Sequence, residues 1–426
     1  MVSSKSKEGL IYNIKLSSVG PARVTGQDVV YEPSNMDLAM KLHYLRGIYY
    51  FDSQAFQDIT IYNIKEPMFL WFNYYYMTNG RFRRAESGRP YIKCNDCGAR
   101  IIEAQCDKTL EEWLEMKDGT LEKLLVSNQV LGPELAFSPP ILIQHTKFKC
   151  GGIALGLSWA HVLGDIFSAT EFWNVLGKVV GGYNPPQPIN LAHSLTKANS
   201  TQTLQKIVED PLSIKRVDPV EDHWIAKNSC KMETFSIHVS ATKLGHLQSR
   251  TDIQGPFESV SAVIWQSISR IRDGPGPQVV TICKKGEEKK ENLVGNTQVI
   301  GVVKVDHSIR EANPSELARL IKHEIIDERL KIDEAIEKEH GVSDVVVYGT
   351  NLTFVSLEGA DLYGFDWMGH KPMNVNYLID GVGEAGTVLV LPAGPNDTEG
   401  RIVTMILPED EIMKLKFELN KEWSIA

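Results

Sequence analysis

The sequence predicts a two-domain α/β protein with mixed sheets. Its 426 residues exceed the roughly 150 residues of a typical domain, which favours two or three domains. Segments rich in branched apolar residues, typical of buried strands, alternate along the chain with helical patterns. A stretch crowded with Pro, Asn, Ser and Thr, residues 181–205, interrupts this alternation near the middle and indicates a connection between domains.

Buried strands are predicted where branched apolar residues dominate a short segment. Such segments lie at 141–144, 152–159, 298–304, 351–355 and 387–391. The crowded stretch between the second and third of these divides the chain. We therefore expect an N-terminal domain over residues 1–190, a crossover linker over 191–222 and a C-terminal domain over 223–426.

The longest helix is predicted from Pro314 to His340. Asn313 can cap it, proline suits a first helical turn, and Gly341 follows its end. Its buried side would be formed by Leu317, Ile321, Ile325, Ile332 and Ile336.

Composition and charge exclude several classes of protein. Hydrophobic residues make up 42% of the chain and charged residues 23%, as in folded globular proteins. The formal net charge of −9 gives no broad basic surface, so we expect no nucleic-acid partner. Six scattered cysteines indicate reduced thiols rather than a disulfide framework. We expect no signal peptide and no transmembrane segment, because no apolar run approaches ~20 residues.

The most informative segment runs from residue 144 to 177. An apolar strand ending at Trp159 is followed by His161. A helix is predicted to start near Asp165, because Ser168 and Glu171 have the spacing of a capping box. The sequence therefore places an imidazole and a carboxylate at a strand-to-helix turn.

This turn has two interpretations. An imidazole titrates near neutrality, so His161 can take a proton from a hydroxyl or thiol and return it later, while Asp165 orients the ring or holds the loop. In the simpler interpretation, Asp165 only caps its helix, worth about 1 kcal/mol. His161 is then a hydrogen-bonded residue of a buried turn. The remaining histidines have no partner that the sequence assigns.

The sequence His161-Val162-Leu163-Gly164-Asp165 resembles the HxxxD motif of the plant BAHD acyltransferases, which are CoA-dependent enzymes. Segments in the family's order extend this resemblance over nearly the whole chain, at 33–51, 79–84, 94–107, 257–265 and 401–415. The resemblance implies a chloramphenicol acetyltransferase-like fold with a channel between its domains. It also implies that about 370–400 joins the N-terminal domain and that His161 faces the channel.

The second signature of the family, DFGWG followed by Lys-Pro, is altered. Residues 364–372 read GFDWMGHKP. Counting back from Lys371 puts Asp366 at the family's Asp, but Trp367 replaces Phe, and Gly369 and His370 replace Trp and Gly. In the family this segment is structural, so the departure bears on CoA binding and leaves the base in place.

Further segments narrow the resemblance to the glossy and eceriferum branch of the family, whose members act in cuticular wax formation. They lie at 36–44, 90–96, 148–165, 228–232 and 348–355. What the branch implies is elongation of very-long-chain acyl-CoAs beside a membrane-bound condensing enzyme, a ketoacyl-CoA synthase of the endoplasmic reticulum. We therefore expect a cytoplasmic protein that is attached to that membrane peripherally, through its partner.

Two functions remain open from the sequence. In the first, the chain promotes elongation without standard acyl transfer. In the second, it is an acyl-CoA-dependent O-acyltransferase in which His161 deprotonates an acceptor hydroxyl and Asp165 organises the loop. Acyl-CoA is the expected substrate or ligand in both, and we expect no tightly bound cofactor. Cofactor-binding residues stay unassigned.

Two weaker motifs point to structure rather than chemistry. Residues 381–386 fit GxGxxG, but the apolar segment that follows reads as a strand, so a glycine-rich hairpin turn is favoured over a dinucleotide site. Cys94 and Cys97 form a single CxxC without a second ligand pair, so we expect no metal site.

Overall fold

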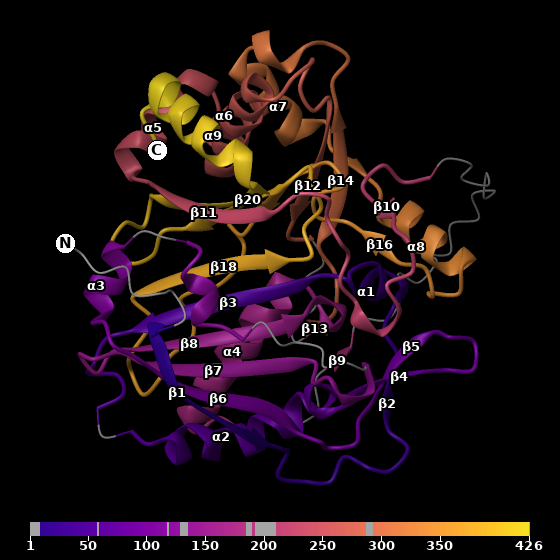
Figure 1. Cartoon of the computed structure of the whole chain (residues 1–426), viewed down its shortest axis with the longest axis vertical. Coiled ribbons are helices and arrows are strands. Elements are labelled where there is room, and N and C mark those ends of the chain that lie inside the picture. Colours follow the sequence, from indigo (N-terminus) through magenta and orange to yellow (C-terminus); the bar gives the residue numbers. More distant parts are fainter. Residues whose placement is uncertain are drawn as a thin grey trace.

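A computed structural model describes residues 9–57, 59–116, 119–127, 135–184, 190–191, 210–286 and 293–425. In this part of the chain, two large mixed sheets lie one above the other, and helices cover the outer side of each half (Figure 1). The α/β fold with mixed sheets expected from the sequence is confirmed.

The first sheet is built mainly from the N-terminal half of the chain. Its strand order is β1-β6-β7-β8-β3-β18. β6 and β7 pair in parallel, whereas β7 and β8 pair antiparallel. The strands are β1 (Ile11–Val19), β3 (Tyr44–Phe51), β6 (Ala99–Cys106), β7 (Ile141–Lys147), β8 (Ile153–Ala160) and β18 (Asn374–Asp380).

The second sheet comes from the C-terminal half. Its strand order is β11-β20-β19-β17-β12-β14-β15, with β12, β17 and β19 parallel to one another. The strands are β11 (Met232–Val239), β12 (Val279–Lys284), β14 (Val299–Lys304), β15 (Ile326–Asp327), β17 (Leu352–Ser356), β19 (Thr387–Pro392) and β20 (Arg401–Pro408). All five strands predicted from apolar runs are therefore confirmed.

Three small sheets and the helices complete the described chain. The small sheets contain β2 (Val30–Tyr31), β4 (Arg81–Arg84) and β5 (Pro90–Lys93); β10 (Lys215–Arg216) and β16 (Val345–Val346); and β9 (Asn190–Leu191) and β13 (Leu293–Val294). The helices are α1 (Asn35–Ala39), α2 (Ile61–Tyr74), α3 (Leu110–Glu115), α4 (Ile166–Val180), α5 (Ala241–Thr251), α6 (Pro256–Ile271), α7 (Pro314–His323), α8 (Arg329–Lys338) and α9 (Glu409–Trp423).

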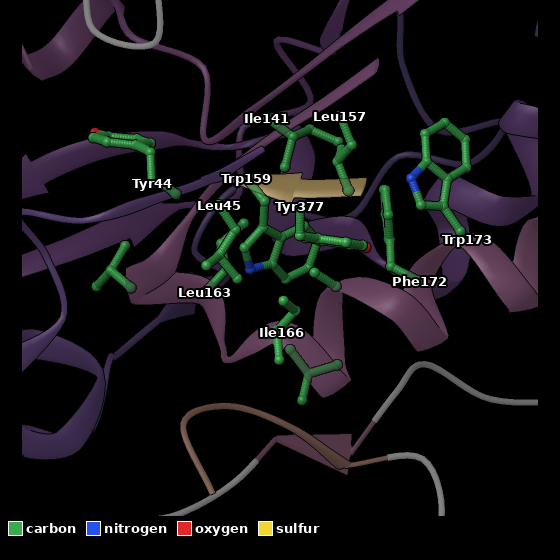
Figure 2. Packing of buried hydrophobic residues seen from close by; sticks show 14 of the residues in the cluster. Tyr44, Leu45, Ile141, Leu157, Trp159, Leu163, Ile166, Phe172, Trp173 and Tyr377 are labelled. Carbon is green, nitrogen blue, oxygen red and sulfur yellow. The ribbon is translucent and has the colours of Figure 1, made fainter. Parts of the chain in front are cut away.

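An aromatic core fixes α4 against the first sheet. Trp159 at the end of β8 lies 5.0 Å from Phe172 of α4, measured between ring centroids. Trp71 of α2 packs on the same ring at 3.9 Å and donates its indole N–H to the carbonyl oxygen of Phe172. Figure 2 shows Trp159, Phe172 and Trp173 together with the apolar residues around them. Because α4 begins directly after the turn that carries His161, this packing also holds that turn.

The predicted helix from Pro314 to His340 is wrong in its middle. The chain forms α7 and α8 instead, with β15 between them, because residues 326–327 pair with the edge of β14. The predicted cap is confirmed, since the side chain of Asn313 accepts a hydrogen bond from the backbone of Ser315. The apolar residues of α7 and α8 also face different cores: Leu317 and Ile321 pack in the core of the second sheet, and Ile332 and Ile336 in that of the first.

The chain crosses between the two sheets near its C-terminal end. β18 pairs antiparallel with β3 in the first sheet, whereas β17 before it and β19 after it belong to the second sheet. The glycine-rich segment 381–386 joins β18 to β19, which do not pair with each other. The predicted hairpin is therefore wrong, because this turn connects two sheets.

Part of the predicted linker, 191–222, lies outside the described residues, namely 192–209. At its start, β9 pairs in parallel with β13 of the C-terminal half. At its end, β10 pairs with β16. Among the described residues, no helix is long and apolar enough to cross a membrane.

Candidate functional site

His161 lies where β8 turns into α4. β8 ends at Ala160, and a single 3₁₀ turn, His161–Leu163, follows. The backbone N–H of His161 donates to the carbonyl oxygen of His43, the residue before β3. The imidazole therefore sits on a short, fully buried turn anchored to the neighbouring strand.

Asp165 is the N-cap of α4. Its Oδ1 accepts a hydrogen bond from the backbone N–H of Ser168, at 3.0 Å. The predicted start of the helix is confirmed, but the predicted capping signal is wrong. Glu171 pairs with Lys178 on the helix surface, and the hydroxyl of Ser168 donates to the carbonyl oxygen of Gly295.

The second oxygen of Asp165 reaches the other half of the chain. Oδ2 accepts hydrogen bonds from the backbone N–H groups of Thr297 (2.9 Å) and Gln298 (3.0 Å) and from the Thr297 hydroxyl (3.2 Å). These residues lead into β14. The carboxylate therefore holds the turn against the C-terminal half, and its hydrogen bonds go to these donors rather than to the His161 ring.

A second contact joins the same loop to this turn. The side-chain amide of Asn296 donates to the carbonyl oxygen of His161 and to Asp37 of α1, both at 2.8 Å. Gly164 packs directly on Gly295: a Cβ added at Gly164, whose φ is +152°, would lie 2.9 Å from the Gly295 nitrogen. The loop that contains Gly295 can therefore approach the turn this closely only because residue 164 is a glycine.

The His161 ring is completely buried, with 0% of the residue exposed. Its Nε2 lies 2.9 Å from the hydroxyl oxygen of Tyr348. Its Nδ1 has no hydrogen-bond partner among the described residues. The channel that the family resemblance implies beside this ring therefore stays a prediction.

A second imidazole lies beside the first. His43 is buried, and its Nε2 accepts hydrogen bonds from the backbone N–H groups of Val347 (3.0 Å) and Tyr348 (3.4 Å). The ring of Tyr348 lies 4.9 Å from that of His43 and 5.4 Å from that of His161, between centroids. Residues 347–348, which precede β17, thus contact both His43 and His161.

Burial determines the charge state of this cluster. It lowers the pKa of His161 to about 4 and that of His43 to about 3, because a protonated imidazole would lose its hydration. Both rings are therefore neutral near pH 7. Burial also raises the pKa of Asp165, and the four hydrogen bonds that the carboxylate accepts lower it by less than burial raises it. A neutral imidazole is the protonation state that a general base requires.

Three residues of this cluster were not predicted from the sequence: His43, Gln298 and Tyr348. Tyr348 lies 187 positions from His161, and Gln298 lies 50 positions from Tyr348. No local spacing signals such contacts. The only indication was indirect, because segments 36–44 and 348–355 were among those that resembled the eceriferum branch.

The altered signature, residues 364–372, anchors to the N-terminal half through aromatic side chains. Phe365 and Trp367 are buried. Trp367 stacks on Phe56 at 5.0 Å with an interplanar angle of 17°. Asp366 closes the turn by accepting a hydrogen bond from the backbone N–H of Gly369, at 2.6 Å. These contacts fit the structural part that the family resemblance assigns to the segment.

Two surface pockets of about 840 and 880 Å³ lie away from His161. Their linings contain Arg84, most residues between 215 and 227, and four residues between 339 and 344. Among the described residues, no group of three or more His, Cys, Asp or Glu side chains could hold a metal ion.

Comparison with known proteins extends the resemblance to the full chain. The sequence model of the Transferase family matches residues 13–422. Protein ECERIFERUM 26 of Arabidopsis thaliana is 42% identical, covering 98% of this chain and 97% of the relative. Protein ECERIFERUM 2 of the same plant is 38% identical, covering 96% and 98%.

Solved structures share the fold at much lower identity. Vinorine synthase superposes with a TM-score of 0.71 at 16% identity, covering 96% of this chain and 98% of that chain. F. graminearum TRI101, complexed with coenzyme A and deoxynivalenol, also gives 0.71, at 15% identity, covering 93% and 98%. At this identity the likeness concerns the fold alone.

Proposed function

Because this chain belongs to the Transferase family of BAHD-type acyltransferases, we propose that it acts in cuticular wax formation by promoting the elongation of very-long-chain acyl-CoAs, without standard acyl transfer. The observation that carries the absence of acyl transfer is the burial of His161, whose Nε2 is already hydrogen-bonded within the protein. The partner would be a membrane-bound condensing enzyme.

The assignment to wax formation rests on overall similarity. Two Arabidopsis proteins named ECERIFERUM are 42% and 38% identical to this chain over nearly its whole length. Acyltransferases of other kinds match less of it and less closely. A hydroxycinnamoyltransferase of Narcissus pseudonarcissus, for example, is 24% identical over 63% of the chain.

The proposal that the protein does not transfer acyl groups rests on the geometry of His161, the residue predicted to act as a base. A general base must lie within hydrogen-bond reach of the proton that it removes from the substrate. Nε2 of His161 has the Tyr348 hydroxyl at that distance, and the residue has no exposed surface. An acceptor alcohol would have to displace Tyr348 before His161 could serve it.

A role beside a condensing enzyme also accounts for the expected location. Among the described residues, no helix could span a membrane, so attachment to the endoplasmic reticulum would come through that partner. Acyl-CoA would be the shared ligand. TRI101, which has the same fold, is known in complex with coenzyme A, and this supports a CoA ligand for the fold without assigning its contacts here.

The alternative is an O-acyltransferase that uses His161 as its base. The observation in its favour is that the low pKa of His161, about 4, leaves the imidazole neutral at physiological pH. In this alternative, Asp165 keeps its position as the cap that holds the turn and touches no reacting atom.

Co-expression with a condensing enzyme in a heterologous host separates the two functions. Wild type, His161→Ala and His161→Gln are expressed at matched levels, and the chain lengths of the acyl products are measured. Glutamine can still accept a hydrogen bond from Tyr348 but cannot act as a proton base. We expect His161→Gln to support elongation as the wild type does.

Two results would contradict the accessory function. One is loss of the longest products with His161→Gln when that variant is as soluble and as thermally stable as the wild type. The other concerns location: expressed without the condensing enzyme, the protein should remain in the supernatant after membranes are pelleted, and pelleting under those conditions would rule out attachment through the partner.

A further inference from the structure

We propose that Tyr348 is the residue that suppresses acyl transfer, because its hydroxyl occupies the position at His161 Nε2 that an acceptor alcohol would need. The inference rests on the proposed function and deepens it by naming the residue responsible. Tyr348 acts through His161 and is therefore a positioning residue. Four features of the described chain support it.

The first feature is the number of acceptor sites on the ring. A neutral imidazole has one unprotonated nitrogen, and that nitrogen accepts one hydrogen bond. The Tyr348 hydroxyl lies 2.9 Å from Nε2, which is the separation expected between a base and the hydroxyl that it deprotonates. While this bond is formed, no second hydroxyl can bind there.

The second feature is the contact of Gln298 with the other side of the Tyr348 hydroxyl. The side-chain nitrogen of Gln298 donates to the hydroxyl oxygen at 2.9 Å, and the hydroxyl lies 3.3 Å from the side-chain oxygen of Gln298. The hydroxyl has one proton, and His161 Nε2, at 2.9 Å, is the nearer of its two acceptors. In the proposed arrangement this proton points to Nε2, and the imidazole proton is on Nδ1.

The third feature is the rigidity of the tyrosine. Tyr348 is 1% exposed, and its own backbone N–H and that of Val347 both face His43 Nε2. Its carbonyl oxygen accepts a hydrogen bond from Gly383, at 2.9 Å. The backbone at Tyr348 is thus held, and rotation of the side chain away from His161 would break the hydroxyl contacts with His161 and Gln298.

The fourth feature is that the Tyr348 hydroxyl keeps its proton. Burial raises the pKa of the phenol well above the ordinary value, because the phenolate would lose its hydration. The hydroxyl therefore remains a hydrogen-bond donor that can occupy His161 Nε2 at 2.9 Å.

Replacing Tyr348 by Phe removes one oxygen and leaves the ring in place. In Tyr348→Phe, a hydroxyl of water or of an added alcohol that enters by the channel implied by the family resemblance would reach Nε2, and its oxygen would attack the thioester carbonyl carbon of an acyl-CoA. His161 Nε2 takes the hydroxyl proton, the carbon–sulfur bond breaks, and the imidazolium returns the proton to the leaving thiolate. The products are free CoA and either a carboxylic acid or an ester.

The experiment measures the release of free CoA thiol from a saturated long-chain acyl-CoA, with and without a primary alcohol. We expect Tyr348→Phe to release CoA at least about a hundredfold faster than wild type, the lower end of the hundred- to ten-thousandfold range of base catalysis. The double variant Tyr348→Phe/His161→Ala should return to the wild-type rate. Tyr377→Phe is the matched control, since Tyr377 is equally buried and its hydroxyl bonds to that of Tyr49 at 2.7 Å.

A spectroscopic measurement tests the hydrogen bond independently of activity. In ¹⁵N-histidine-labelled wild type, His161 should carry its proton on Nδ1, and the Nε2 signal should move towards that of a free nitrogen in Tyr348→Phe. Three results would overturn the proposal: a proton on Nε2 in wild type, no gain in CoA release by Tyr348→Phe, or an acyl group on Tyr348 found by mass spectrometry. Loss of elongation with His161→Gln would refute the proposed function, whereas the CoA-release and ¹⁵N measurements test the blocking role of Tyr348 separately.

Discussion

The two signature regions of this chain differ in an instructive way. The turn from His161 to Asp165 keeps every residue of the family motif, yet Nε2 of its histidine is hydrogen-bonded inside the protein. The segment 364–372 has lost most of its family residues, yet Phe365 and Trp367 still insert into the N-terminal half. The region that matches the family motif therefore has a blocked reactive nitrogen, His161 Nε2. The region that departs from the family sequence keeps its structural contact with the N-terminal half.

The difference arises from what each region needs to work. A structural anchor needs buried apolar area and a tight turn, and several aromatic residues can provide both. A base needs one free lone pair in the right place, and a single hydroxyl from elsewhere in the chain is enough to occupy it. Sequence signatures are thus weaker indicators of chemistry than of packing.

Trp367→Ala is the strongest test of the anchor. The side chain is 1% exposed and stacks on Phe56. Removing it should lower the free energy of unfolding by about 3–5 kcal/mol, as for other buried aromatic residues truncated to alanine. Denaturant unfolding followed by fluorescence measures this. A change below 1 kcal/mol would mean that the altered segment no longer anchors the two halves, and Trp367→Phe should lose less than half as much.

Asp165→Ala tests whether the other region is also structural. The carboxylate accepts hydrogen bonds from four donors: those of Ser168 and Gln298 are buried and the two of Thr297 are partly buried. Leaving these donors without an acceptor should cost roughly 3 kcal/mol or more.

Asp165→Asn is the matched control for this test. It keeps one oxygen and the shape of the side chain, so its cost should lie between those of wild type and Asp165→Ala. Thermal and denaturant unfolding report both variants. Equal stability of Asp165→Ala and wild type would contradict the contact with residues 297–298.

Local features of the fold were predictable from sequence. The five strands were found because buried strands are short runs of branched apolar residues, a property of neighbouring positions. The break between α7 and α8 was missed for the same reason: Leu317 and Ile336 continue one helical pattern, although they face two different cores. Hydrophobic periodicity predicts that residues are buried but does not predict which of the two cores they join.

Only the part of the candidate site that lies within one turn of the chain was predictable from sequence. His161 and Asp165 share one turn, so their proximity followed from spacing. Tyr348 and His43 approach them from distant parts of the chain through tertiary contacts. Whether a lone pair is free depends on those contacts, so the state of the base was beyond local reasoning.

A pH series separates the buried histidine from the carboxylate beside it. Burial lowers the pKa of folded His161 to about 4, whereas an unfolded histidine titrates near 6.5. Between pH 6.5 and about 4 the unfolded chain therefore binds the additional proton, and stability falls as the pH falls. His161→Gln lacks this contribution.

The stability of wild type relative to His161→Gln should consequently decline by up to about 1.4 kcal/mol per pH unit within that window. His43, whose ring lies 6.4 Å from that of His161, and the nearby carboxylates Asp37 and Asp165 remain in both proteins, so their titration largely cancels in the difference. Denaturant unfolding at pH 6.5, 5.5 and 4.5 measures it. Parallel pH curves for the two proteins would show that His161 is not a buried neutral imidazole.

Met368→Gly should have the smallest effect and completes the contrast within the altered segment. Met368 follows Trp367 but is 64% exposed, and its φ of +53° lies in the left-handed region. Glycine adopts this φ without a steric penalty but loses more chain entropy on folding, so the two terms oppose each other. The free energy of unfolding should change by less than about 1 kcal/mol, in denaturant experiments parallel to those on Trp367→Ala. A loss comparable to that of Trp367→Ala would mean that the turn itself, rather than the inserted aromatic ring, anchors the segment.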